Sequence, residues 1–373
     1  MRKNHITMKI GNSRKLIPFL LLIAAMSSIQ VCYGQGLTTI VAATNNFLKT
    51  LNPEELKATQ FSFTDSLRIK WSNFPVGMVP RAGIRYGTLG DQSRVAFHDM
   101  LSTFLSSQGY LKVTGIMQLD DILNILSQQA FDQGKMSAGQ LKNILEKLGW
   151  GYDNYFISIW GTPNEKEPWG FSLGGHHMAL SLTMRGKDIS FTPMFVGTDP
   201  AQIQTAKYAG WRVLSKEEDY GFLLLGFLSK AQKAKAILTQ ATPKDIITNP
   251  ESSQRITTYS GIAAKEFNAD QLEVFKILIQ EYLHNFEHDV AHGLYDKIVK
   301  TGFDKVYFAW IGGEQRHTPH YYIINGPDFL IEYDNVGFQN DGNHIHAILR
   351  QKDNDFGSDI LKDHYLNSDH HKK

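Results

Sequence analysis

Cysteine is almost missing from this chain, with one residue, Cys32, among 373. Disulfides therefore cannot stabilise the fold, but a chain of this length can bury a large core without them. Excess charge is also missing. The formal net charge is +1, and it becomes +1 − 5 = −4 without residues 1–34, which hold five basic and no acidic side chains. Nucleic-acid binding is therefore not expected.

Long apolar runs are missing too, except for Leu16–Met26, which follows Arg2, Lys3, Lys9, Arg14 and Lys15. A basic segment followed by a short apolar one is typical of a secretory signal peptide, and this run is too short to span a bilayer comfortably. We expect cleavage after Gly34, which would remove Cys32, leave no membrane span and deliver the protein to the periplasm or the medium. No linker or repeat divides the rest, so we predict one domain over 35–366 and a polar tail over 367–373.

The pattern along the chain predicts an α+β protein, with a helical N-terminal half packed on a mixed, largely antiparallel sheet that ends in a C-terminal meander. Asn52 and Pro53 predict a helix start. Apolar residues at helical spacing predict a helix over 95–105 that ends at Gly109, and another over 116–126.

The second half alternates between the two element types. Aromatic and β-branched runs predict strands over 155–160, 177–183 and 189–192. Ser215 with Glu218, and Asn268 with Gln271, predict helix starts, the second of a long helix that reaches about Val299. Four strands close the chain, with short connections typical of an antiparallel meander, over 306–311, 321–325, 329–333 and 344–349.

The last two of these strands carry acids and histidines that face each other. Side chains alternate along a strand, so Glu332 and Asp334 share one face, and His344 and His346 share one face of the partner strand. Two histidines at this spacing can bind one metal ion, with the acids as ligands, partners of the ligands or proton carriers. The alternative is a solvated face of an ordinary antiparallel sheet.

Other histidines are candidates for the same site. Gly174 and Gly175 precede the pair His176 and His177, which opens a predicted strand with the two imidazoles on opposite faces, and His364 follows Asp355 in a C-terminal turn and short helix. The segment His284–His288 matches the H-x-x-E-H pattern of inverted zinc peptidases. Helical projection nevertheless places its histidines opposite the apolar face, so we expect them to point outward.

Many ordered motifs resemble a family of secreted bacterial proteins known as domain of unknown function thirty-five hundred. The resemblance implies secretion and marks the polar groups as candidates, but it carries no catalytic role. The motifs are Trp71-x-x-Phe-Pro, Arg81-x-Gly, Gly109-Tyr, Gly175-His-His, Pro193-x-Phe-x-Gly, Gly210-x-Arg-x-Leu, Tyr321-Tyr, Gly326-Pro, Glu332-Tyr-Asp, His344-x-His, Asp355-Phe-Gly-x-Asp and His364-Tyr.

These patterns favour an exported, metal-dependent hydrolase that acts on a small or polymer-derived substrate, with zinc as the default metal. A copper or iron oxidoreductase and a non-catalytic ligand-binding protein are the alternatives. The candidate metal ligands are His176, His177, His344, His346 and His364. The candidate catalytic acids are Glu332, Asp334 and Asp355, and the candidate substrate-binding residues are Trp71, Arg81, Trp169, Tyr321 and Tyr322.

Overall fold

A computed structural model of the chain describes residues 32–250, 255–337 and 340–360. In this part, one mixed and open sheet of 13 strands runs through the molecule in the order β1-β3-β4-β5-β7-β13-β12-β11-β10-β8, with β2, β6 and β9 beside it. The strands are β1 (Gln60–Phe61), β2 (Ile84–Arg85), β3 (Phe156–Trp160), β4 (Trp169–Gly175), β5 (Met178–Arg185), β6 (Asp188–Ser190), β7 (Met194–Thr198), β8 (Ile237–Thr239), β9 (Ile262–Ala263), β10 (Tyr307–Gly312), β11 (His320–Asn325), β12 (Phe329–Asn335) and β13 (Ile345–Gln351).

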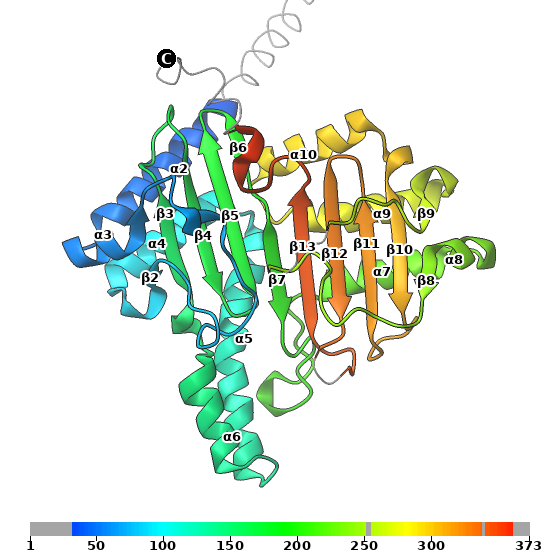
Figure 1. Ribbon diagram of the computed structural model, residues 1–373, viewed down its shortest axis with the longest axis horizontal. Helices are drawn as coiled ribbons and strands as arrows, with labels where there is room; N and C mark the ends of the chain where they lie inside the picture. The colour runs from blue at the N-terminus through cyan, green and yellow to red at the C-terminus, as the bar shows by residue number, and fades with distance from the viewer. Residues whose placement is uncertain (1–31, 251–254, 338–339, 361–373) are drawn as a thin grey trace, which may run out of the picture.

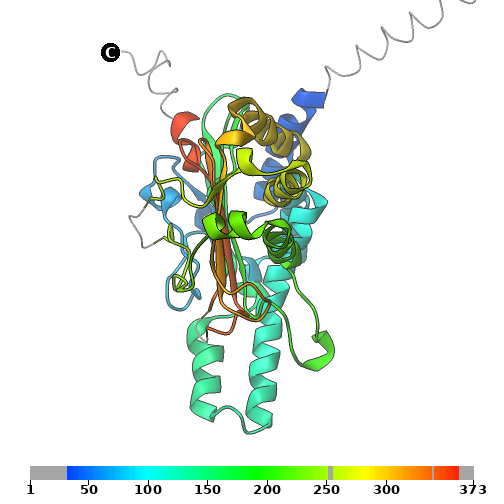
Figure 2. The same cartoon turned by 90° about the vertical axis from the view of Figure 1, so that its right-hand side faces the viewer.

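Most of the helices cover one face of this sheet, α6 projects below it, and irregular segments cover the other face (Figures 1 and 2). The apolar stripes of the helices and the inward side chains of the strands form the main core, which includes Phe97, Ile116, Phe275 and Phe308. None of the helices in the described residues is long and apolar enough to cross a membrane. The helices are α2 (Cys32–Lys49), α3 (Pro53–Thr59), α4 (Asp91–Phe104), α5 (Ser107–Asp132), α6 (Ala138–Asn143), α7 (Ser215–Phe227), α8 (Lys230–Ala236), α9 (Ala269–Leu283) and α10 (His288–Thr301).

The predicted α+β class is confirmed, and so is the C-terminal meander. Strands β10 to β13 pair antiparallel with their sequence neighbours, and parallel pairing is confined to β1 with β3 and β8 with β10 in the described sheet. Asn52 and Asn268 cap α3 and α9, as predicted, and the structure shows that both caps are capping boxes. These starts were readable because a cap is a local hydrogen-bond pattern between residues three apart.

Several element boundaries differ from the prediction. The helix predicted to end at Gly109 ends at Phe104, and Gly109 lies inside α5, where a Cβ atom would be 1.9 Å from the carbonyl oxygen of Asn285. Ser215 does not cap α7, because the Glu218 side chain pairs with Arg212 instead of returning to the helix start. The long helix predicted to reach Val299 is two helices, broken between Leu283 and His288.

The strand prediction missed β4 and β7, and this changes the setting of the paired histidines. Gly174 and Gly175 end β4, so His176 and His177 form the turn into β5 and do not open a strand. The predicted signal peptide lies outside the described residues except for 32–34, which begin α2. His364 and the polar tail also lie outside them.

Candidate metal centre

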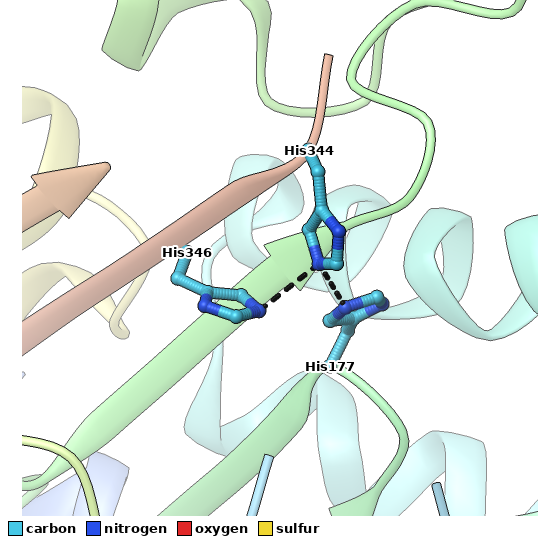
Figure 3. A group of neighbouring side chains, drawn as sticks. All are labelled: His177, His344 and His346. Atoms are coloured by element: carbon cyan, nitrogen blue, oxygen red, sulfur yellow. Dashed lines mark hydrogen bonds between the residues drawn. The ribbon is translucent and has the colours of Figure 1, made fainter. Parts of the chain in front are cut away.

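Three imidazoles from two segments distant in sequence converge at the ends of central strands of the sheet. His177 comes from the turn between β4 and β5, and His344 and His346 come from the start of β13; this is the lower edge of the sheet in Figure 1. The Nε2 atoms of His177 and His344 are 2.8 Å apart, and those of His344 and His346 are 3.1 Å apart (Figure 3). The three ring nitrogens therefore point at one small volume.

Sheet register explains why these side chains meet. Strand β7 lies between β5 and β13, and Gly197 on β7 pairs with His346. A Cβ atom at Gly197 would lie 3.1 Å from ring carbons of both His177 and His346, so glycine leaves the space that the two rings occupy. His177 itself has a φ of 58°, which places it in the left-handed region that side chains rarely adopt.

One aspartate holds the outer nitrogen of His346, and two more lie near the rings. The Nδ1 atom of His346 is 2.7 Å from Asp245 Oδ1 and 3.7 Å from Asp334 Oδ2, and the Nδ1 atom of His344 is 3.6 Å from Asp199 Oδ2. A carboxylate on Nδ1 holds the ring proton there and directs the Nε2 lone pair outward, which is the usual arrangement of a metal-binding histidine.

Burial and mutual repulsion keep two of the rings neutral. Burial, together with the neighbouring histidines, places the pKa values of His177 and His344 well below the ordinary value. Burial also lowers the pKa of His346, but Asp334 and Asp245 outweigh it and raise that pKa overall. Neutral imidazoles are the ligand form, so the electrostatics of His177 and His344 suit cation binding.

The nearby acids have raised pKa values of their own. Burial raises the pKa of Asp334 to about 7 although His346 opposes the shift, and its Oδ2 atom has no hydrogen-bond partner among the described residues. Burial likewise raises the pKa of Asp199 to about 6. The Asp199 side chain is 34% exposed, so this carboxyl group has access to water beside the buried histidines.

The second histidine of the pair has a separate carboxylate. His176 Nδ1 is 2.8 Å from Asp120 Oδ1 on α5, and the imidazole stacks on Trp150 and lies against His177 with ring centroids 3.8 Å apart. His177, Asp120 and His176 form a second group that could hold a cation, and Asp245, Asp334 and His346 form a third. The three groups share members, so they describe one polar region and not three separate centres.

The structure places the other predicted acids away from the histidines. The Glu332 carboxylate accepts hydrogen bonds from Tyr321, from Thr248 and from the backbone N–H of Ile247, and it thereby holds the loop that carries Asp245. Asp355 accepts from Arg350 and from the Gln351 backbone at the far end of β13. Both carboxylates are occupied by structural contacts.

The predicted substrate-binding residues are also dispersed. Trp169 is wholly buried in the core, and the Tyr322 hydroxyl meets Tyr282 on the helical side of the sheet. Trp71 packs on Phe195 on the opposite side. Tyr321 bonds Glu332, and the two terminal nitrogens of Arg81 bond backbone carbonyls. These residues do not gather into one pocket with the histidines.

Sequence reasoning missed the aspartates that complete the region. Asp199 and Asp245 lie in irregular segments, where no spacing relates them to the histidines. Asp120 did leave a signal, because it is an acid within the apolar stripe of α5 and is 2% exposed. A charged residue on the buried face of a helix calls for a partner.

The chain belongs to the family described as Protein of unknown function (DUF3500), whose model matches residues 34–358. The comparisons with curated proteins and with solved structures found no match. The family description names no activity, so the chemistry has to be argued from the site.

Proposed function

We propose that this protein is an exported metal-dependent hydrolase whose His177, His344 and His346 bind one zinc ion. The supporting observation is the convergence of three Nε2 atoms at 2.8 and 3.1 Å. Ligands at about 2.0 to 2.1 Å from a tetrahedral zinc ion lie roughly 3.3 Å apart, so small side-chain shifts suffice to admit the ion. Three protein ligands leave one coordination position open, which is the pattern of catalytic zinc sites.

When bound, zinc would supply a water of lowered pKa for attack on an ester, an amide or a similar bond. The residues of the chain would supply the rest. Asp245 fixes the His346 ring, and Asp199 is a partly exposed carboxyl group whose pKa of about 6 suits it to exchange a proton. Copper is the second candidate metal, because a donor set of imidazoles alone suits copper as well as zinc. An oxidoreductase would then replace the hydrolase.

Elemental analysis of the purified mature protein tests the proposal. We expect one zinc ion per chain, lost in His344→Ala, and hydrolysis of chromogenic esters or amides by the wild type only. The matched control is His98→Gln, because the two ring nitrogens of His98 lie 3.1 and 3.0 Å from the hydroxyl oxygens of Tyr86 and Tyr110, and no carboxylate pairs with this ring in the described part of the chain. This control should keep its zinc.

The outcomes separate the alternatives. Stoichiometric copper with an electron paramagnetic resonance signal would favour the oxidoreductase, and a bound metal without turnover would favour the binding protein. A wild type that holds no metal would refute the metal centre. Mass spectrometry of the same exported sample should find an N-terminus near Gln35, and an intact Met1 would refute export by cleavage.

A further inference from the structure

Arg81 anchors a covering segment to the turn that carries His177. This segment, residues 71–81, lies on the sheet face opposite the helices, where Trp71 packs on Phe195 (Figure 2). The Arg81 Nη2 atom donates to the carbonyl oxygens of Ser72 at 2.9 Å, Phe74 at 2.5 Å and Gly175 at 3.1 Å, and Nη1 donates to the carbonyl oxygen of Val79. Three of these acceptors lie in the covering segment, and Gly175 lies two residues before His177.

The guanidinium group has no carboxylate partner in the described part of the chain, where its bonds all go to backbone carbonyls. Burial lowers the pKa of this guanidinium group to about 10, because the cation is partly withdrawn from water. A buried cation is costly unless its donors are used. Here the two terminal nitrogens of the guanidinium group fix the shape of the backbone, while Nε has no hydrogen-bond partner among the described residues. A lysine ammonium, a single point charge, cannot reach the same set of carbonyls equally well.

The same covering segment contacts both His177 and Asp245, the aspartate that holds His346. The backbone N–H of His177 donates to the Asn73 carbonyl oxygen at 3.3 Å, and the Asn73 side-chain amide donates to Asp245 Oδ2 at 3.3 Å. The left-handed backbone of His177 is strained for a residue with a side chain and persists only where neighbours hold it. The backbone of His177 is held by Asn73 and by the Gly197 N–H, which donates to the His177 carbonyl oxygen at 2.8 Å, and Arg81 ties the segment of Asn73 to Gly175.

We propose that Arg81 is a positioning residue of the metal centre, which fixes His177 in its ligand orientation by fastening the covering segment to Gly175. This inference rests on the proposed metal-binding function. Arg81 then has a role within the protein, whereas the sequence marked it as a candidate substrate-binding residue. Contacts around a metal ligand typically change metal affinity by ~10- to 100-fold when removed.

The test measures the zinc dissociation constant by chelator competition for Arg81→Gln and for the milder Arg81→Lys. We expect ~10- to 100-fold weaker binding in Arg81→Gln and an intermediate loss in Arg81→Lys. The matched control is Arg68→Gln. Arg68 is a buried arginine that likewise donates to a backbone carbonyl, that of Phe356, but it bonds Thr183 near the far end of β5. Its loss should leave zinc affinity unchanged.

A double-mutant cycle shows whether Arg81 acts through His177. In a His177→Ala background, Arg81→Gln should change zinc affinity by no more than about twofold, because the ligand that Arg81 positions is gone. The visible spectrum of the Co²⁺ form should change in Arg81→Gln and not in Arg68→Gln. If Arg81→Gln does not fold, Arg81→Lys carries the same cycle.

The possible failures are distinguishable. A wild type that binds no zinc refutes the proposed function. A wild type that binds zinc, together with Arg81 variants that match Arg68→Gln in affinity and spectrum, refutes only the role of Arg81. If Arg81→Gln weakened zinc binding equally in the wild-type and His177→Ala backgrounds, the role would also be refuted, because the effect would then not depend on His177.

Discussion

Two sets of three histidines in this molecule have opposite surroundings. His177, His344 and His346 come from segments far apart in sequence and meet beneath the surface, with His344 6% exposed. His284, His288 and His292 are four residues apart in sequence and belong to the end of α9 and to α10. His284 and His288 are exposed, and the rings of His288 and His292 lie 4.8 Å apart.

The difference shows that the backbone conformation decides whether a histidine pattern in the sequence can form a metal site. The H-x-x-E-H pattern needs one continuous helix, but α9 ends before His284, and the Glu287 side chain accepts the N–H of Asp289 to cap α10. No aspartate or glutamate pairs with these surface rings among the described residues, whereas Asp245 pairs with His346. The outward direction predicted for His284 and His288 is confirmed.

The largest effect that separates the two sets should come from Gly197→Ala. The new Cβ atom would lie 2.7 Å from the carbonyl oxygen of Ile345 and 3.1 Å from two ligand rings, so backbone and imidazoles must move. We expect zinc affinity to fall by ~10-fold or more and stability by roughly 1–3 kcal/mol. Chelator competition and denaturant unfolding measure the two effects.

The control for this change is a glycine in the same helix as His288 and His292. Gly293 is in α10, and a Cβ atom at this position would have no other atom within 4 Å, so Gly293→Ala should keep zinc affinity and raise helix stability by up to ~1 kcal/mol. If Gly197→Ala bound zinc as tightly as Gly293→Ala does, the idea that ring space at Gly197 matters to the site would be wrong.

A smaller effect concerns pH and a buried histidine outside both sets. His320 is wholly buried, and burial lowers its pKa. Below the unfolded value of about 6.5, the unfolded chain binds a proton there that the folded protein does not, so His320 destabilises the fold as the pH falls. We therefore expect His320→Gln to gain stability relative to the wild type by up to ~1.4 kcal/mol per pH unit below pH 6.5.

Urea unfolding of the metal-free proteins at pH 8 and pH 5.5 measures this difference. The value at pH 8 is the internal control, because His320 is neutral in both states there and the substitution shows only its packing cost. A stability difference that is the same at both pH values would contradict the expected charge effect.

The smallest effect on zinc binding should come from the exposed histidines, His284, His288 and His292. Replacing His284 and His288 together with Gln should leave zinc content and turnover within error of the wild type, because both side chains point to solvent. Elemental analysis of the double variant checks this. Loss of stoichiometric metal with the fold intact would restore the peptidase interpretation and remove the contrast between the two sets.

Sequence patterns predicted the element types where the physics is local. The capping boxes at Asn52 and Asn268 and the strands of the meander follow from residues that are close along the chain. The facing of Asp334 and His346 also followed from strand alternation, and the two residues are paired in the register of β12 and β13.

The rest of the region depends on tertiary contacts that a single sequence does not encode locally. Asp245 reaches His346 because Glu332 holds the backbone of the following residues, and His177 reaches His344 because β7 lies between their strands. The sequence prediction missed strand β7, so its pairing with β5 and with β13 could not be inferred. The break before His288 was missed for a similar reason, since Glu287 N–H bonds the carbonyl of Phe104 on a distant helix.

The position of β7 also bears on the order in which the chain assembles. This strand joins the part of the sheet made before residue 200 to the meander made after residue 300, and the three histidines straddle that junction. His177 and His344 are 167 residues apart, so no early folding fragment can offer all three rings at once. An ion held by these histidines would bind only after the strands before residue 200 have docked on the C-terminal meander. It would then stabilise the docked state and slow the separation of the two parts of the sheet.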